Sequence, residues 1–309
     1  INETKFVVDN PKFFQEVNKL VGEYHLTDII WYMMNRTIYS IGNYVDDKIY
    51  NIIFDFYGRT LLGQQEPKPR WKRVMSLVQS LLGELLGKRY VENYFPEESK
   101  KKALVMVNDL KDSLHEKILG LEWMSEETKQ KAILKLNSFR VKIGYPDKWR
   151  DYSDLHCKEE DSYIDCIFKC REFETKWEYF QLDLPVDRSK WEMNPQEINA
   201  YYHPLMNEIV FPAGILQAPF FDANQDNAYN YGAIGAIIGH EMTHGFDDQG
   251  RKFDSDGNMV NWWTDKDAEE YTKRTNVIRD QYAVYEVEGE KVNGELTLGE
   301  NIADIGGLL

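Results

Sequence analysis

Two histidines four residues apart, His240 and His244, stand with Glu241 in the sequence His-Glu-Met-Thr-His, after an apolar run spaced by glycines. On a helix, residues at this spacing lie on one face, so both imidazoles can point at one metal ion. Glu241 can then reach a metal-bound water as a general base. This pattern is typical of zinc-dependent peptide hydrolysis, which needs neutral imidazoles for zinc and a carboxylate for the proton. A pentapeptide of this kind also arises by chance, so the rest of the chain must decide.

A catalytic zinc site needs a third protein ligand and an open position for water. The class with three histidines has a glycine and a histidine three and six positions after the second histidine, where this chain has Asp247 and Gly250. An aminopeptidase-like site expects a glutamate in the stretch that contains Trp262-Trp263. Glu300 is the better candidate, because it shares a helix face with Asp304. One carboxylate can bind the metal while the other fixes the tautomer of a ligand histidine.

The composition indicates a large globular chain. With 309 residues, 42% of them hydrophobic and 14% aromatic, the chain can bury a substantial core in one large or two smaller domains. A net charge of −15 argues against nucleic-acid binding, and no apolar run is long enough to span a bilayer. The start at Ile1 is neither an initiator methionine nor a signal peptide, so we expect both natural ends, and any export signal, to lie outside this sequence.

Three cysteines, Cys157, Cys166 and Cys170, fall within one short acidic stretch. An odd number cannot all pair within one chain. Cys166 and Cys170 could pair, or the three could hold a metal with His156, but their spacing matches no zinc finger or ribbon. We expect reduced or locally paired thiols in a surface loop, which leaves the redox compartment open.

The elements that must position these residues change in type along the chain. Capping signals and apolar spacing predict successive helices up to about residue 150, starting near 10–11, 27–28, 71, 96–98 and 125–127. The apolar residues from 71 to 85 predict one helix face. After residue 160 the pattern predicts helices over 162–177, 227–246 and 265–285 and from about 298, with short strands over 197–202 and 208–211.

Taken together, these motifs resemble the neprilysin family of zinc metallopeptidases, which includes endothelin-converting enzymes and bacterial oligopeptidases. The motifs, which span essentially the whole chain and are jointly specific, are 240–248, 300–304, 199–202, 210–216, 219–221, 230–235, 123–128 and 143–146.

The resemblance implies a role for each matching residue of the site. His240, His244 and Glu300 would bind one Zn²⁺ per chain, and Glu241 would activate the zinc-bound water. Asp304 would accept a hydrogen bond from a ligand histidine.

The resemblance also implies how substrate is bound. Asn199 and Ala200 match the edge strand that binds the substrate backbone, as expected for an extended peptide that adds to a sheet edge. Phe220 and Ile237 match an apolar pocket just after the scissile bond, with Ile215 beside them; the alternative is that all three are ordinary core.

The implied fold is mainly α. A partial helical, cavity-forming domain over residues 1–160 would precede a thermolysin-like (gluzincin) catalytic portion with a small β-sheet over 161–309, truncated at its C-terminus.

The implied activity is hydrolysis of internal bonds of oligopeptides, on the amino side of apolar or aromatic residues. Peptides are therefore the expected partners, without nucleic acid or a membrane segment in this chain, and the oligomeric state stays open. An extracytoplasmic compartment (cell envelope, periplasm or secretion) is expected, with the cytoplasm as the alternative.

The chain departs from the family in three places. The family's catalytic domain continues beyond Leu309 and carries there a histidine that stabilises the oxyanion and an arginine that holds substrate. Part of the helical domain is absent, and Val74 replaces a disulfide cysteine of the animal enzymes, which favours a bacterial-type oligopeptidase. None of the six histidines follows Glu300. Because losing an oxyanion donor costs on the order of a hundredfold in rate, we expect weak or no activity from this fragment, and the functional prediction concerns the parent protein.

Two other functions stay open. A non-catalytic zinc protein or interaction scaffold would keep the metal but hydrolyse no peptide. A zinc aminopeptidase would require a free amine on its substrate.

Overall fold

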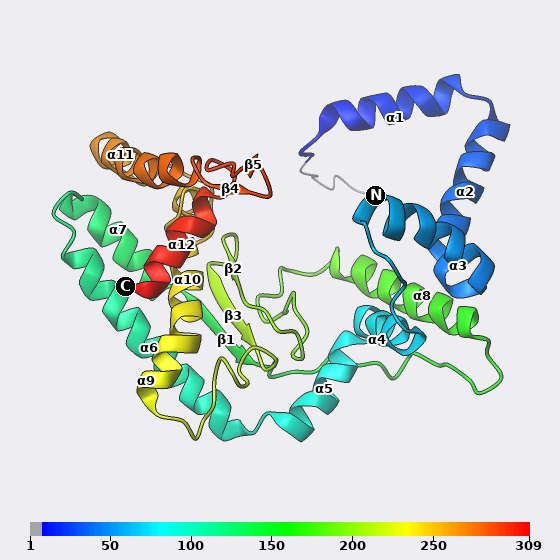
Figure 1. Ribbon diagram of the computed structural model, residues 1–309, viewed down its shortest axis with the longest axis horizontal. Helices are drawn as coiled ribbons and strands as arrows, with labels where there is room; N and C mark the ends of the chain where they lie inside the picture. Colours follow the sequence, from blue (N-terminus) through cyan, green and yellow to red (C-terminus); the bar gives the residue numbers. More distant parts are fainter. Residues whose placement is uncertain (1–7) are drawn as a thin grey trace. The chain divides into compact units, whose positions relative to one another are not determined.

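The computed structural model describes residues 8–309 (Figure 1). The described residues form two compact units, one made of residues 8–77 together with 155–176, the other of 78–154 together with 177–309. The expected division into 1–160 and 161–309 follows sequence patterns rather than contacts, and it stays a prediction. Within the described part of the chain, no helix combines the length and the apolar content needed to cross a bilayer.

The first unit is helical. It contains α1 (Pro11–Glu23), α2 (Leu26–Val45), α3 (Asp47–Ile53), a π-helix (Phe54–Leu61), the start of α4 (Arg70–Leu81) and most of α8 (Tyr163–Gln181). Asn10 caps α1 as predicted, because its side chain accepts a hydrogen bond from the backbone N–H of Phe13 at 3.3 Å.

The three cysteines belong to this unit and are free thiols. Cys157 is exposed and precedes α8, whereas Cys166 and Cys170 lie on α8, which agrees with the helix predicted over 162–177 and shows that the expected surface loop is wrong for these two residues. They do not form a metal-binding group, because the one group of potential metal ligands found among residues 8–309 contains none of the cysteines.

The second unit combines helices with a small sheet. Its helices are α5 (Gly83–Tyr94), α6 (Glu97–Leu119), α7 (Glu126–Asn137), α9 (Asn227–Asn230), a π-helical turn (Tyr231–Gly235), α10 (Ala236–His244), a 3₁₀ turn (Gly250–Lys252), α11 (Asp265–Tyr282) and α12 (Leu298–Leu308). The strands are β1 (Arg140–Gly144), β2 (Tyr201–His203) and β3 (Glu208–Pro212), followed by a hairpin of β4 (Glu286–Val287) and β5 (Glu290–Lys291). A mainly α fold with few strands was predicted, and the structure confirms it.

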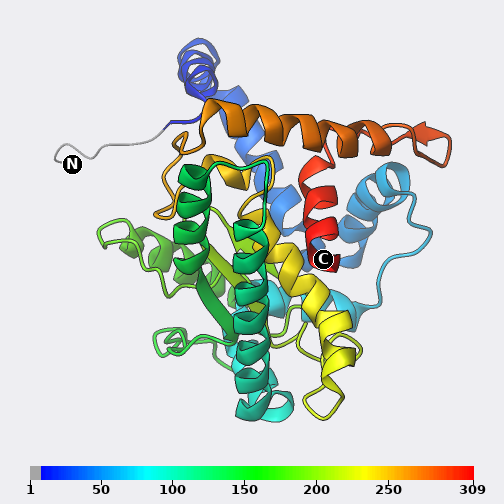
Figure 2. The same cartoon turned by 90° about the vertical axis from the view of Figure 1, so that its left-hand side faces the viewer.

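The sheet has the order β1-β3-β2, with β1 parallel and β2 antiparallel to the central strand β3. All five residues of β3 are buried, whereas β2 lies at the edge of the sheet. α10 packs along α12 and also contacts α6 and β2, and Figure 2 shows α9 and α10 running beside α6. α10 is therefore held between two helices and the edge of the sheet.

Several elements differ from the sequence prediction. The apolar face from 71 to 85 is divided between two helices, since α4 ends at Leu81 and α5 begins at Gly83. A Cβ at Gly83 would lie 2.2 Å from the Asn194 side chain, so close packing and low helix propensity coincide at this break. The predicted strand over 197–202 begins only at Tyr201, where pairing with Val210 starts, so that Asn199 and Ala200 precede it.

A buried carboxylate joins two helices of the second unit. Asp267, 1% exposed near the start of α11, accepts hydrogen bonds from the hydroxyls of Ser125, Thr128 (2.6 Å) and Thr264 (2.7 Å), and from the Ser125 N–H at 3.0 Å. Burial disfavours its charged form, but these hydrogen bonds outweigh burial and lower the pKa of Asp267 to about 2. The starts of α7 and α11 are thus tied through one ionised side chain.

We predict that Asp267→Asn lowers the free energy of unfolding at pH 7 by about 2 kcal/mol, which corresponds to the downward pKa shift. Because the folded-state pKa lies below the ordinary value of 3.8, this contribution is present above about pH 5 and is lost as the pH falls toward 2. Urea unfolding followed by circular dichroism at pH 7 and pH 3 measures both effects. Asp265→Asn, an exposed acid in the same first turn, is the matched control and should change stability by less than about 0.5 kcal/mol. Equal losses in the two variants would contradict the prediction.

Candidate metal centre

Close contact between α10 and α12 brings residues far apart in the sequence together. A Cβ at Gly307 would lie 2.3 Å from the backbone oxygen of Ala236, and one at Gly306 would lie 2.1 Å from the hydroxyl of Thr243. Only glycine allows the two backbones to approach this closely. The first turn of α12, which carries Glu300, therefore lies over the histidine face of α10.

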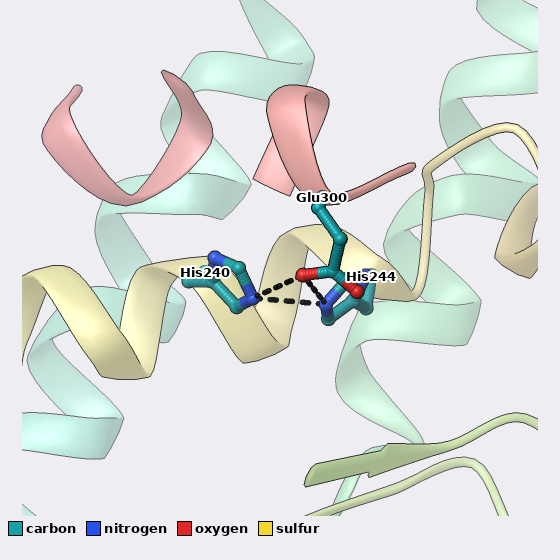
Figure 3. A group of neighbouring side chains, drawn as sticks. All are labelled: His240, His244 and Glu300. Atoms are coloured by element: carbon teal, nitrogen blue, oxygen red, sulfur yellow. Dashed lines mark hydrogen bonds and ion pairs between the residues drawn. The ribbon is translucent and has the colours of Figure 1, made fainter. Parts of the chain in front are cut away.

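His240, His244 and Glu300 form the one group of potential metal ligands in the described chain, with one ligand atom from each lying within 4.8 Å of the others (Figure 3). Glu300 Oε2 lies 3.3 Å from His240 Nε2 and 3.7 Å from His244 Nε2. The two Nε2 atoms are 2.9 Å apart, somewhat less than the roughly 3.3 Å between two tetrahedral ligands at ordinary zinc–nitrogen distances. The donor set and its dimensions therefore fit a zinc ion.

The outer nitrogen of each imidazole has its own carboxylate partner. His240 Nδ1 lies 2.9 Å from Asp304 Oδ1, and His244 Nδ1 lies 2.7 Å from Asp247 Oδ2. A carboxylate at Nδ1 favours the tautomer whose proton is on that nitrogen, which leaves Nε2 with a lone pair for a metal. Both rings are thus prepared to bind metal through the nitrogens that face each other.

Sequence reasoning did not assign a role to Asp247. It used the residue only to exclude the class with three histidines, although its position three residues after His244 on a helix end could have suggested contact with that ring. Asp247 is buried at 5% exposure, and its second oxygen accepts hydrogen bonds from the N–H groups of Gln249 (2.9 Å) and Gly250 (2.6 Å). The carboxylate is therefore held at both oxygens.

Burial changes the acidity of the neighbouring groups. Burial raises the pKa of Glu241, against the opposing charges of His244 and His240. Burial alone would lower the pKa of His244, but the hydrogen bond and charge of Asp247 outweigh it and raise that pKa. Glu241 is only 7% exposed, so most of its surface is shielded from bulk water.

A pocket of about 440 Å³ lies over these residues. Its lining includes His240, Glu241, His244 and Glu300, and from the segment at the sheet edge Asn199, Ala200, Tyr201 and Tyr202. The structure thus brings the predicted backbone-binding residues and the predicted metal ligands into one pocket. Phe220 and Ile237 do not line it; both are half-buried and pack against the hydrophobic core.

Two family models match most of the chain, and both are described as peptidase family M13: one covers residues 1–146 and the other 199–309. The chain belongs to peptidase family M13.

Individual M13 relatives agree with this assignment. An endothelin-converting enzyme homolog of Locusta migratoria is 37% identical over 98% of this chain and 43% of its own length. A neutral endopeptidase of Lactobacillus helveticus is 37% identical over 98% of this chain and 47% of its own length. The structure of the Mycobacterium tuberculosis zinc metalloprotease Zmp1 in complex with an inhibitor superposes with a TM-score of 0.90 at 43% identity, over 98% of this chain and 47% of that one. This M13 chain thus spans less than half the length of these relatives.

We predict that Asp247→Asn in this M13 protein lowers zinc affinity ten- to a hundredfold, because a carboxylate behind a ligand histidine orients the ring and raises its basicity. Competition with a chromogenic chelator measures the affinity. Asp248→Asn is the matched control, because it removes the same charge from the next residue. Within residues 8–309 Asp248 forms no hydrogen bond to a histidine, so this change should lower zinc affinity less. Equal losses of affinity would instead indicate a general charge effect.

Proposed function

We propose that the protein containing this chain is a zinc-dependent endopeptidase that hydrolyses internal bonds of oligopeptides. The observation that carries the proposal is the buried carboxyl group of Glu241, which lines the same pocket as a set of two imidazoles and one carboxylate. A zinc centre that only stabilises a fold has four protein ligands and no open position, whereas a catalytic one has three. The description of the M. tuberculosis relative as a zinc metalloprotease supports the same conclusion.

The proposed ligands are His240, His244 and Glu300. Imidazole nitrogens favour zinc over magnesium or calcium, which prefer oxygen ligands. When bound, zinc would polarise the scissile carbonyl and lower the pKa of a water molecule. Asp304 and Asp247 would hold the two imidazoles in the required orientation, as their contacts at Nδ1 support.

Glu241 is the proposed general base. Its carboxylate would take a proton from the water that attacks the scissile carbonyl and would then give that proton to the leaving amine nitrogen. A carboxyl group in water is a weak base at neutral pH, and the upward shift caused by burial brings its pKa closer to the working pH.

The substrate would bind as an extended peptide along the segment that leads into β2. This segment lies at the edge of the sheet, and both Asn199 and Ala200 line the pocket. An edge segment can form main-chain hydrogen bonds with a peptide, and the exposed Asn199 amide offers its N–H donors and a second lone pair on Oδ1, which already accepts from the Ala200 N–H at 2.9 Å. The preference for cleavage before apolar residues rests on the family resemblance of Phe220 and Ile237 rather than on the lining of this pocket.

We predict that Glu241→Gln in the full-length protein reduces hydrolysis of a quenched peptide by about a thousandfold, because the amide cannot accept the proton. Zinc content, measured by atomic emission, should stay at the wild-type level, since Glu241 is not a proposed ligand. Glu286→Gln, an exposed glutamate on β4, is the matched control.

The same assay separates the alternative functions. Cleavage of an N-acetylated peptide excludes an aminopeptidase, which needs the free amine. A zinc-loaded wild-type protein that hydrolyses no peptide would support an interaction scaffold and overturn the proposal.

We predict that Asn199→Ala raises KM about fivefold with kcat nearly unchanged, because one hydrogen bond to the bound peptide contributes about 1 kcal/mol to substrate and transition state alike. Steady-state kinetics on the quenched peptide measure both constants. Ile198→Ala, at a neighbouring position that is 69% exposed and outside the pocket lining, should leave KM unchanged. A fall in kcat alone would show that Asn199 acts in some other way.

A further inference from the structure

Lys135, on α7, is among the largest fully buried side chains of the described residues, with 1% of its surface exposed. Its ammonium nitrogen donates hydrogen bonds to the backbone oxygens of Gly250 at 2.6 Å and Phe253 at 2.7 Å. Burial lowers the pKa of Lys135 to about 7, against the opposing charges of Asp247 and Asp254. Burying a lysine is costly, so its contacts point to a definite role.

The backbone segment that Lys135 holds is the one that places Asp247. The Gly250 oxygen accepts from Lys135, and the Gly250 N–H donates to Asp247 Oδ1 at 2.6 Å. The other oxygen of Asp247 contacts His244 Nδ1 at 2.7 Å. A continuous series of hydrogen bonds therefore leads from Lys135 to the ring of His244, through a residue 115 positions away in the sequence.

The position of Lys135 is fixed from several sides. Its ammonium group lies 5.6–6.0 Å from the ring centroids of Tyr202, Phe246 and Trp262. The Phe253 oxygen also accepts from the indole N–H of Trp262 at 3.0 Å. A Cβ at Gly250 would lie 1.8 Å from the His244 backbone oxygen, so the turn packs directly against the end of α10. A displacement of this turn would therefore also displace the backbone of His244.

We propose that Lys135 is a positioning residue for the metal centre, which anchors the turn at Gly250–Phe253 and thereby holds Asp247 against His244. The inference rests on the proposed function of His244 as a zinc ligand. It assigns a role in metal binding to a residue of α7 that lines no part of the pocket.

A double-mutant cycle on zinc affinity tests this coupling in the full-length protein. Lys135→Met keeps an apolar stem of the same length but removes the donors, and we expect it to weaken zinc binding about tenfold. In an Asp247→Asn background the same change should weaken binding by less than about twofold, because the residue through which Lys135 acts is already altered. Leu136→Ala, a change at the neighbouring fully buried residue of α7, is the matched control for loss of core packing and should leave zinc affinity unchanged while the protein remains folded.

The outcomes distinguish this inference from the proposed function. Two results overturn the role of Lys135 but leave the metal site intact. One is wild-type zinc affinity in Lys135→Met, and the other is an equal loss of affinity when Lys135→Met is made in the wild-type and in the Asp247→Asn protein. Wild-type zinc affinity in His244→Ala overturns the site itself. If circular dichroism shows that Lys135→Met does not fold, Lys135→Gln replaces it, because the amide retains a donor for one carbonyl. A smaller loss of zinc affinity in Lys135→Gln, absent when the change is made in the Asp247→Asn protein, supports the inference.

Discussion

The close contact between α10 and α12 is the constraint on which the site depends. The three potential metal ligands come from two helices, and their ligand atoms lie within 4.8 Å of one another only because the helix backbones approach at Gly306 and Gly307. Helices with ordinary side chains at the contact lie about 8–10 Å apart at their axes. The glycines that look like weak helix formers are thus what allows Glu300 to lie opposite the histidines.

Buried charge is the second theme of this strongly acidic chain. Asp267, Asp247 and Lys135 are each almost fully buried, and each is surrounded by hydrogen-bond partners that offset the loss of water. Asp267 ties two helix starts together, whereas Asp247 and Lys135 organise the turn after α10. Removing one member of such a network leaves its partners buried without hydrogen bonds, which costs more than an average contact contributes.

Local patterns predicted what depends on local geometry. The four-residue spacing of His240 and His244 places both side chains on one face of a helix. The capping residues predicted most helix starts to within a residue or two. Distant contacts had no local signal. Lys135 resembles a solvated charge among other lysines. In β1, charged and apolar residues alternate, which is a local strand signal that the prediction did not use, but its pairing with β3, about 68 residues later, has no local signal. The sequence is equally consistent with Phe220 in the core or in a substrate pocket, since apolar character does not specify which cavity a side chain faces.

The three potential ligands also differ in freedom of movement. The imidazoles of His240 and His244 are mostly buried and held by carboxylates, whereas the side chain of Glu300 is 69% exposed. Two donors are therefore preorganised as a rigid pair, while the third can change rotamer without disturbing the core. At the proposed zinc site, exchange of a bound ion with solvent would then depend on the rotation of the Glu300 side chain at the first turn of α12.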